Sequence, residues 1–561
     1  MISRRDIRMD KPWLGRYSNR PDADFELHAT LYNTYANVAR HYPDDIAVVI
    51  EDTREKYTHR EFLELVDTVS DGFRDLGIRD GSKVGIILNG FVEDAATLFA
   101  LNKIGAVGKY IDFMKSVPSI KHSVEETPLD ALIIDECFLP LEQAVNERHI
   151  LTVVGNTVRE YSEGHYKSYP KKNAKASKGH GYPVPYVKDK PCVIISSSGT
   201  TGEPKPIMHS DYGVNAAAQK MMYTDYPITR GNVITKMIPS QVGLGLILSL
   251  YAGLIGGATV VMFSACSTDN LVGKLVSFTK GFRVFLKDHN LNPDAKLNII
   301  TAPIFVRALV RYPEKIDLSI VGSLMGDGSK MSAKELDEML EIARSNGLKC
   351  PICNGYGQNE LAAGPVTINC NQYNINGSAG FPTYKTDIII VNPDTLERLD
   401  VNEIGWVLES SNSEFLCYDG LPQQTENARV TLADGTRWFN SYDLGYMDEE
   451  GFLFIVGRTS RVVIREDHKI SLDEVEQKIR GFSFIEDCAT IVSKQGGSVE
   501  EFVAFIVSNS KDAVRKIKES NSLHEYETPS EFIVVDSLPY KTQGKIDYQL
   551  LQKNYQQQFG S

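Results

Sequence analysis

The sequence predicts an α/β fold in which parallel strands alternate with helices. Short apolar runs of strand length recur in its first half, at 83–88 (KVGIIL), 131–134 (ALII) and 192–195 (CVII). Residues 91–104 follow the first run with apolar side chains at helical spacing, and Gly105 is a typical stop signal for that helix. Near-continuous apolar strands are typical of parallel sheets that helices cover.

The last hundred residues have a different character. Residues 452–456 (FLFIV) and 461–464 are predicted strands, and Ser471 begins a capping box that predicts a helix. A domain boundary is expected near Thr459-Ser460, because a short mixed α and β segment follows it. The sequence therefore predicts two domains, 1–459 and 460–561.

Composition excludes several classes of protein. The 561 residues carry 60 Lys and Arg against 73 Asp and Glu, a net charge of −13, and are 42% hydrophobic. These values exclude a collagenous, coiled-coil or disordered chain. The acidic balance argues against broad nucleic-acid binding, which needs a basic face.

Neither the N-terminus nor the longest uncharged stretch predicts export or membrane insertion. Residues 1–13 lack the apolar core of a secretory signal. Residues 242–263 carry no charge, but glycines dilute them and Gly256-Gly257 breaks them, which predicts a buried helix, a turn and a strand rather than a transmembrane segment. Eight cysteines give no disulfide framework, and we expect a cytoplasmic protein.

The clearest chemical signal is ISSSGTTGEPKP at 195–206. A predicted strand runs directly into hydroxyl side chains, two glycines and a lysine. Gly199 and Gly202 let the backbone turn so that amide N–H groups converge, and Lys205 adds a mobile positive charge. The Walker pattern is absent. The segment favours a phosphate-binding loop over the alternative, a flexible Ser/Gly linker, because linkers do not usually follow a buried strand.

A second segment, NGYGQNE at 354–360, follows the strand-like LKCPIC at 348–353. Tyr356 could stack on a planar base, and Glu360 could reach a divalent cation whose other ligands are phosphate oxygens. The alternative is a Gly-Tyr-Gly turn with a surface glutamate.

Two further segments lie near the predicted domain boundary and the C-terminus. In SYDLGYMDEEGFLFIVGR, Asp443 could accept hydrogen bonds from a ribose diol, and Arg458 is a fixed cation; the alternative is a β-hairpin with an acidic turn. In LPYKTQGKI, a glycine before Lys545 favours an exposed loop, and alone this lysine is an ordinary surface residue.

Taken in order, SSGTTGEPK, NGYGQNE, YDLG…GR and the terminal GK resemble the adenylate-forming superfamily: acyl- and aryl-CoA synthetases, adenylation domains and firefly luciferase. The resemblance runs from about Leu31 to Leu551. It implies a large N-terminal domain of two α/β subdomains plus a β-barrel-like subdomain, and a small mobile α+β C-terminal domain. It also implies that a small-molecule carboxylic acid attacks ATP to form an acyl-adenylate, after which a thiol takes the acyl group.

The resemblance implies a role for each matching residue. Ser198, Gly199, Thr200, Thr201, Gly202 and Lys205 match the loop that holds the ATP phosphates. Tyr356 and Gly328 match the adenine site, and Asp443 and Arg458 the ribose site. Asn359 matches a donor to the α-phosphate, Glu360 the Mg²⁺ carboxylate, and Lys545 the catalytic lysine that bridges the carboxylate and the α-phosphate.

Several positions depart from the family pattern. Val242 replaces a histidine beside the acyl site, and Ser460 replaces the usual charged residue at the hinge. Asp467 replaces a glycine in the loop that enters the site for the second step, where a carboxylate would crowd a pantetheine arm and repel phosphates. CoA is the acceptor we favour, and the alternative is a stand-alone adenylating enzyme that transfers the acyl group to a carrier protein or an amine.

Overall fold

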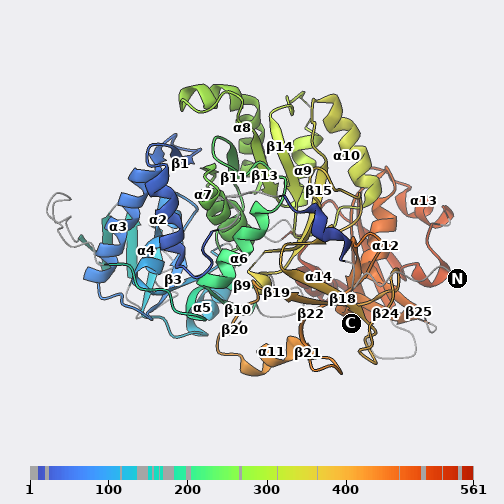
Figure 1. Ribbon diagram of the computed structural model, residues 1–561. Coiled ribbons are helices and arrows are strands. Elements are labelled where there is room, and N and C mark those ends of the chain that lie inside the picture. The colour runs from blue at the N-terminus through green and yellow to red at the C-terminus, as the bar shows by residue number, and fades with distance from the viewer. Residues whose placement is uncertain are drawn as a thin grey trace.

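The computed structural model describes most of the chain, and Figure 1 shows its arrangement. The described residues are 11–18, 25–113, 117–135, 150–154, 157–162, 165–168, 182–197, 204–264, 268–312, 314–362, 364–465, 468–494, 501–520, 522–540 and 546–559. Predictions about residues 198–203, 466–467 and 541–545 lie outside these ranges.

One nine-stranded sheet runs through the N-terminal part in the order β17-β16-β15-β14-β13-β11-β12-β1-β2. Its strands are parallel from β15 to β1 and antiparallel at both edges. The strand bounds in this order are Phe381–Pro382, Pro365–Ile368, Ile352–Gly357, Val321–Gly326, Leu297–Thr301, Val233–Lys236, Thr259–Met262, Ile46–Ile50 and Lys56–Thr58.

A second nine-stranded sheet has the order β20-β10-β9-β4-β3-β5-β6-β7-β8 and is parallel from β9 to β6. Its bounds in this order are Cys417–Tyr418, Pro206–Ser210, Pro191–Ser196, Val107–Tyr110, Lys83–Ile87, Ala131–Ile134, Ile150–Val154, Thr157–Ser162 and His165–Ser168. The strands predicted at 83–88, 131–134 and 192–195 are β3, β5 and β9, so the α/β prediction is confirmed.

Helices separate and cover the two sheets. Helix α6 contacts β10 of one sheet and β16 of the other, α7 packs on β12 and α4 on β4, so these helices lie between the sheets. Helices α9 and α10 pack against β14 and β15. The helix bounds are Leu31–His41 (α2), His59–Asp75 (α3), Val92–Ile104 (α4), Val117–Glu125 (α5), Asp211–Met222 (α6), Ala252–Ile255 (α7), Thr268–Asp288 (α8), Pro303–Val310 (α9) and Ala333–Ser345 (α10).

The predicted helix at 91–104 is confirmed as α4, and Gly105 ends it with a φ of 89°. The strand predicted at 348–353 was misplaced. Strand β15 begins at Ile352 and continues through Gly-Tyr-Gly to Gly357, because it pairs with β14 on one side and β16 on the other. A Cβ on Gly355 would lie 2.3 Å from Met325 Cε, the end of a flexible side chain on β14, so Met325 would have to move to admit a larger residue here.

Residues 242–263 form the predicted helix, turn and buried strand, with one difference. The helix begins as a π-helix at Leu244–Tyr251 (η4) before α7 and β12 follow. A Cβ on Gly245 would lie 2.1 Å from the Ile238 carbonyl oxygen, so the close approach of these backbones depends on glycine. Across the described part of the chain, no helix has both the length and the apolar character needed to cross a bilayer.

A third, antiparallel sheet has the order β18-β19-β22-β21, with β23 paired to β22. Helix α11 (Pro422–Asn427) packs beside it. The bounds are Thr386–Val391 (β18), Gly405–Ser411 (β19), Arg429–Thr431 (β21), Arg437–Met447 (β22) and Leu453–Arg458 (β23). Together with the two larger sheets, this sheet completes the large N-terminal part of the fold.

The small C-terminal part has its own apolar core. One buried cluster runs from Val463 to Ile517 and another from Ala489 to Leu551, whereas the main core ends at Leu453. Figure 1 shows this part at the opposite end of the molecule from α2, α3 and α4. Its elements are β24 (Val462–Arg465), β25 (His468–Ser471), α12 (Leu472–Arg480), β26 (Ile485–Lys494), β27 (Glu501–Ser508), α13 (Ala513–Glu519), β28 (Glu531–Val534) and α14 (Tyr548–Phe559).

The Ser471 hydroxyl accepts a hydrogen bond from the Glu474 N–H, so the predicted helix start at Ser471 is confirmed. The separate cores support a boundary where the sequence predicts one, and we propose that the domains are 1–459 and 460–561. Strand β23 ends at Arg458, directly before the proposed boundary, so its last residues connect the third sheet to the C-terminal part.

A buried carboxylate where α2, α4 and α6 meet predicts a pH effect on stability. Asp211 Oδ1 accepts hydrogen bonds from Leu31 N (3.0 Å) and Asn102 Nδ2 (2.7 Å), and burial raises the pKa of Asp211 to about 6. Because an unfolded aspartate has a pKa of about 3.9, ionisation opposes folding increasingly as pH rises from about 4 to 6 and by a constant amount above that.

We expect Asp211→Asn, which keeps the oxygen acceptor without the charge, to raise the melting temperature more at pH 7 than at pH 5. At pH 7 the free energy of unfolding of Asp211→Asn should exceed that of wild type by an amount on the order of 2 kcal/mol. Thermal unfolding of wild type and variant at both pH values measures it. An equal Tm difference at the two pH values would contradict the assignment.

Candidate active site

Tyr356 and Asp443 are 87 residues apart in sequence and in direct contact in the fold. The Tyr356 hydroxyl lies 2.6 Å from Asp443 Oδ2, which brings together β15 and β22. The pairing of β22 with β23 sets Asp443 opposite Arg458, whose Nε donates to Asp443 Oδ1 at 3.0 Å. The two residues predicted for the ribose site, Asp443 and Arg458, are therefore in contact. They lie on paired strands of a β-hairpin, which was the alternative interpretation of this segment.

The electrostatics of this cluster follow from burial. Asp443 is 4% exposed, and its charge raises the pKa of the Arg458 guanidinium. Burial, with the charge of Asp443 adding to it, holds the pKa of the Tyr356 phenol well above its usual value. Tyr356 therefore stays a neutral phenol, and it offers both a flat ring and a fixed hydroxyl.

A cavity of about 1520 Å³ opens beside this cluster and is lined by both parts of the chain. Gly328, Tyr356, Asp443 and Arg458 all line it, so the structure brings these four predicted site residues together. Gly328 has a φ of +94°, a conformation that other residues rarely adopt. From the C-terminal part, the lining includes Arg461, Leu538, Tyr540, Ile546 and Tyr548.

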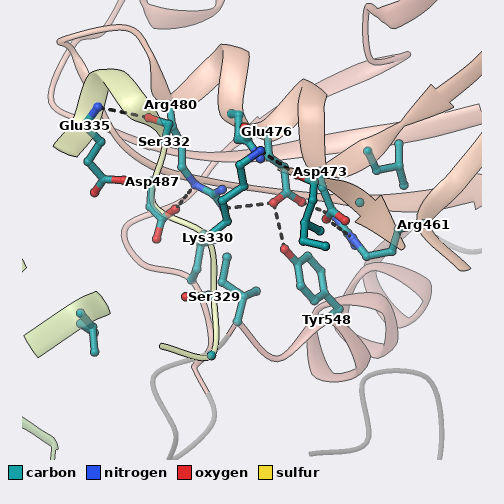
Figure 2. Close-up of a pocket in the computed structure, with 18 of the residues that line it drawn as sticks. Ser329, Lys330, Ser332, Glu335, Arg461, Asp473, Glu476, Arg480, Asp487 and Tyr548 are labelled. Carbon is teal, nitrogen blue, oxygen red and sulfur yellow. Dashed lines mark hydrogen bonds and ion pairs between the residues drawn. The ribbon is translucent and has the colours of Figure 1, made fainter. Parts of the chain in front are cut away.

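The C-terminal wall of the cavity is built around one buried carboxylate. Glu476, 2% exposed, accepts hydrogen bonds from Arg461 Nη2 (2.5 Å), Arg480 Nη2 (3.0 Å) and the Tyr548 hydroxyl (2.9 Å). Figure 2 shows Arg461, Arg480 and Tyr548 gathered around Glu476, with the Lys330 side chain beside this cluster. Because it ties the first residues of the C-terminal part to α14, it makes this wall a continuous unit.

Glu360 lies in a short 3₁₀ turn, Asn359–Leu361, just after β15. The Tyr418 hydroxyl donates to Glu360 Oε1 at 2.9 Å, and the Lys205 ammonium lies over the Tyr418 ring, 4.8 Å from its centroid. Tyr418 is 4% exposed and therefore holds the predicted metal carboxylate next to the lysine of the predicted phosphate loop.

The described ends of the Gly-rich segment are fixed in place. Ser197 N donates to the Lys205 carbonyl, and Lys205 N donates to Ser197 Oγ, both at 2.9 Å. The Asn359 amide donates to the Ser196 carbonyl at 2.8 Å, which ties the segment to the turn that carries Glu360. The structure therefore brings Lys205, Asn359 and Glu360 into one neighbourhood.

Other predicted site residues lie outside the described residues. They are Ser198, Gly199, Thr200, Thr201, Gly202 and Lys545, together with Asp467. Tyr540 and Ile546, which are on either side of the segment that holds Lys545, both line the cavity.

Sequence reasoning missed three side chains that support the site. Tyr418 stands alone in CYDG, where no spacing pattern points to a role. Gln358 donates to Glu409 and to the Tyr356 hydroxyl. Alternation along β19 could have placed Glu409 on one face with Val407 and Ser411, but it could not have identified partners on another strand.

Removing the Tyr418 hydroxyl tests its hold on Glu360. We expect Tyr418→Phe to raise the Mg²⁺ concentration needed for half-maximal pyrophosphate release by about fivefold, because one hydrogen bond to a carboxylate is lost. A Mg²⁺ titration measures this, with Tyr312→Phe, beyond the end of α9, as the control. An unchanged Mg²⁺ requirement would show that Glu360 keeps its position without Tyr418.

Comparison with known proteins agrees with this arrangement. A family model described as AMP-binding enzyme matches residues 35–418, which is more than half of the chain. This chain belongs to the AMP-binding enzyme family. The expected resemblance to adenylate-forming enzymes is therefore confirmed.

Individual relatives and solved structures match most of the chain. Feruloyl-CoA synthase of an Amycolatopsis species is 25% identical over 87% of this chain and 92% of its own. ATP-bound MatB from Rhodopseudomonas palustris superimposes with a TM-score of 0.78 at 18% identity, covering 94% of this chain and 99% of MatB. O-succinylbenzoate CoA synthetase of Bacillus subtilis, solved with ATP and magnesium ion, gives a TM-score of 0.74 at 18% identity, covering 92% and 99%. These structures share the large N-terminal and small C-terminal division described above.

Proposed function

We propose that this AMP-binding enzyme activates a small-molecule carboxylic acid with ATP, forming an acyl-adenylate and pyrophosphate, and then transfers the acyl group to the thiol of CoA. The observation that carries this proposal is the convergence of Tyr356, Asp443 and Arg458 on a cavity whose lining also includes Tyr540 and Ile546, the described residues on either side of Lys545 in the sequence. The family match and the CoA ligase names of several relatives support it.

The nucleoside would be held by the N-terminal wall of the cavity. The Tyr356 ring offers a flat surface for adenine, and the tight backbone at Gly328 leaves room beside it. Asp443, already oriented by Tyr356 and Arg458, would accept hydrogen bonds from the two ribose hydroxyls. We assign the phosphates to Ser198, Gly199, Thr200, Thr201, Gly202 and Lys205, and a donor to the α-phosphate to Asn359.

A Mg²⁺ ion fits the donor set around Glu360. Among the described residues, no group of three or more His, Cys, Asp or Glu side chains could hold a metal alone. Mg²⁺ commonly uses one or two carboxylates together with phosphate oxygens and water, so Glu360 next to the phosphate loop suffices. When bound, the ion would neutralise charge that develops on the phosphates.

Lys545 would act on the reacting atoms. A free carboxylic acid is a poor acyl donor because its leaving group would be oxide, whereas in the mixed anhydride AMP is the leaving group. An ammonium between the attacking carboxylate and the α-phosphate reduces their repulsion and stabilises the charge of the transition state. Because Lys545 is a flexible, strongly hydrated point charge on the smaller domain, it can be withdrawn before acyl transfer.

Asp467 is the residue that bears on which molecule accepts the acyl group in the second step. A carboxylate in the loop that enters the site for the second step would oppose a pantetheine arm and its phosphates. The second candidate is therefore an enzyme that transfers the acyl group to a carrier protein or an amine. In either case we propose a cytoplasmic enzyme that does not act on nucleic acid.

A panel of carboxylic acids, scored for pyrophosphate release with and without CoA, tests this function. We expect at least one acid to give ATP- and Mg²⁺-dependent release, with acyl-CoA formed when CoA is present. Release without acyl-CoA, together with CoA use after Asp467→Gly, would favour the second candidate. No acid-dependent release across aliphatic, aromatic and amino acids would contradict both.

A further inference from the structure

Glu409 is a completely buried carboxylate directly behind the nucleotide-facing residues. It lies on β19 with 0% exposure, whereas Tyr356 and Asp443 line the cavity. The Tyr356 hydroxyl lies 3.0 Å from Glu409 Oε1, and Gln358 Nε2 lies 2.6 and 2.7 Å from the two carboxylate oxygens. The protonation state of a carboxylate with this set of partners requires an explanation, because burying a charged group without a compensating partner costs free energy.

The number of protons available for hydrogen bonds limits which groups around the Tyr356 hydroxyl can be ionised at the same time. The Tyr356 hydroxyl oxygen lies within hydrogen-bonding distance of Asp443 Oδ2 (2.6 Å), Glu409 Oε1 (3.0 Å) and Gln358 Nε2 (3.1 Å). A phenol has one proton to donate. If it donates to Asp443, the shorter contact, the contact with Glu409 holds only when the Glu409 carboxyl supplies a proton of its own.

The charges that face Glu409 favour the protonated carboxyl. Burial and the negative charge of Asp443 hold the pKa of Glu409 well above its usual value, and Glu360 adds to this. Its neighbours across the sheet, on β18 and β22, are Ile388 and Phe439, neither of which titrates.

A cation that opposes this trend, Lys220, comes from α6. Lys220 donates to Ser411 Oγ and Ser413 Oγ, its contact with Ser413 being 2.8 Å, and burial lowers the pKa of Lys220 to about 7. Arg458, the cation that contacts Asp443, is engaged with that carboxylate. Lys220 is therefore a weak counter-charge, bound to hydroxyls rather than to the Glu409 carboxylate.

We propose that Glu409 is a positioning residue for the nucleoside site: as a neutral carboxylic acid it donates to the Tyr356 oxygen, so that Tyr356 donates its own proton to Asp443. This chain of hydrogen bonds, Glu409 to Tyr356 to Asp443, keeps Asp443 oriented and fixes the angle of the Tyr356 ring. The inference rests on the proposed function, since the site that it orders is the proposed adenosine site.

Two substitutions separate the neutral acid from an ionised one. Glu409→Gln keeps the shape and an N–H donor toward Tyr356 without the possibility of ionisation, whereas Glu409→Ala removes both. Titration calorimetry with ATP, in the absence of any acid substrate, measures the effect on the nucleoside site directly. The exposed Glu403, just before β19, provides the control Glu403→Gln.

We expect Glu409→Gln to bind ATP within about threefold of wild type and Glu409→Ala to bind about tenfold more weakly. Between about pH 6 and pH 9, the affinity of Glu409→Gln relative to wild type should stay constant or rise, because only wild type can lose the proton. In steady-state assays the Ala variant should raise the KM for ATP while the KM for the acid is unchanged.

Loss of affinity in Glu409→Gln equal to that in Glu409→Ala, or tight ATP binding by the Ala variant, would overturn the proposal. A double-mutant cycle with Tyr356→Phe guards against a general folding defect. Tyr356→Phe should weaken ATP binding in the wild-type background but add no further loss to Glu409→Ala, because both act through one hydroxyl. If wild type itself bound no adenine nucleotide, the proposed function would fail before this inference is reached.

Discussion

Lys545→Ala should lower acid-dependent pyrophosphate release by about 10²- to 10³-fold, the largest effect we expect from any single substitution. The reason is that Lys545 would stabilise charge that exists only in the transition state. ATP binding, which depends on Tyr356 and Asp443, should change little. The measurement is kcat for pyrophosphate release under saturating ATP and acid.

Lys541 lies in the same segment, four residues earlier, and Lys541→Ala is the matched control because it removes the same charge without the role. Acyl transfer from chemically prepared acyl-adenylate to CoA should survive Lys545→Ala, since this lysine serves only the first step. Full pyrophosphate release by Lys545→Ala would remove it from the mechanism, and equal losses in both lysine variants would point to the fold of the segment instead.

Glu360→Gln should raise the Mg²⁺ concentration for half-maximal activity by about 10- to 100-fold. The amide keeps one oxygen ligand and its hydrogen bond from Tyr418 but loses the charge that attracts a hard cation. A Mg²⁺ titration of pyrophosphate release at saturating ATP measures the change. The loss should be partly recovered at high Mg²⁺, because the phosphate ligands remain.

Tyr418→Phe provides a comparison for the result with Glu360→Gln. It perturbs the same carboxylate without removing its charge, so its smaller shift separates orientation from charge. Glu414→Gln, which alters a carboxylate held by Arg429 Nε at 2.6 Å, controls for a general effect of losing acidic charge nearby. A Mg²⁺ dependence in Glu360→Gln identical to wild type would mean that the metal is held elsewhere.

Local patterns in the sequence were sufficient for much of the fold. The parallel strands β3, β5 and β9, helix α4 with its glycine stop and the capped start of α12 all follow from apolar periodicity and end signals that involve only neighbouring residues. The strand at β15 was misplaced because its glycines argue against a strand locally. Contacts with β14 and β16 override that preference.

The residues of the candidate site also fall into two groups, those that the sequence could identify and those that it could not. Short motifs and their order predicted Tyr356, Asp443 and Arg458 as nucleotide-site residues, and the structure brings these three together on one cavity. Tyr418 and Glu409 could not, because their importance comes from partners 58 and 53 residues away that are brought into contact only by the folded chain.

By itself, therefore, the sequence determined the class of fold and the family, and it predicted the chemical groups that would face the ligand, since each depends on a contiguous motif or a repeating pattern. Only the tertiary structure decided which buried groups orient them. Strand register brings Asp443 opposite Arg458 and sets Glu409 behind Tyr356. The protonation of a buried carboxyl depends on the charges and donors around it in space, and no spacing along the chain encodes that environment.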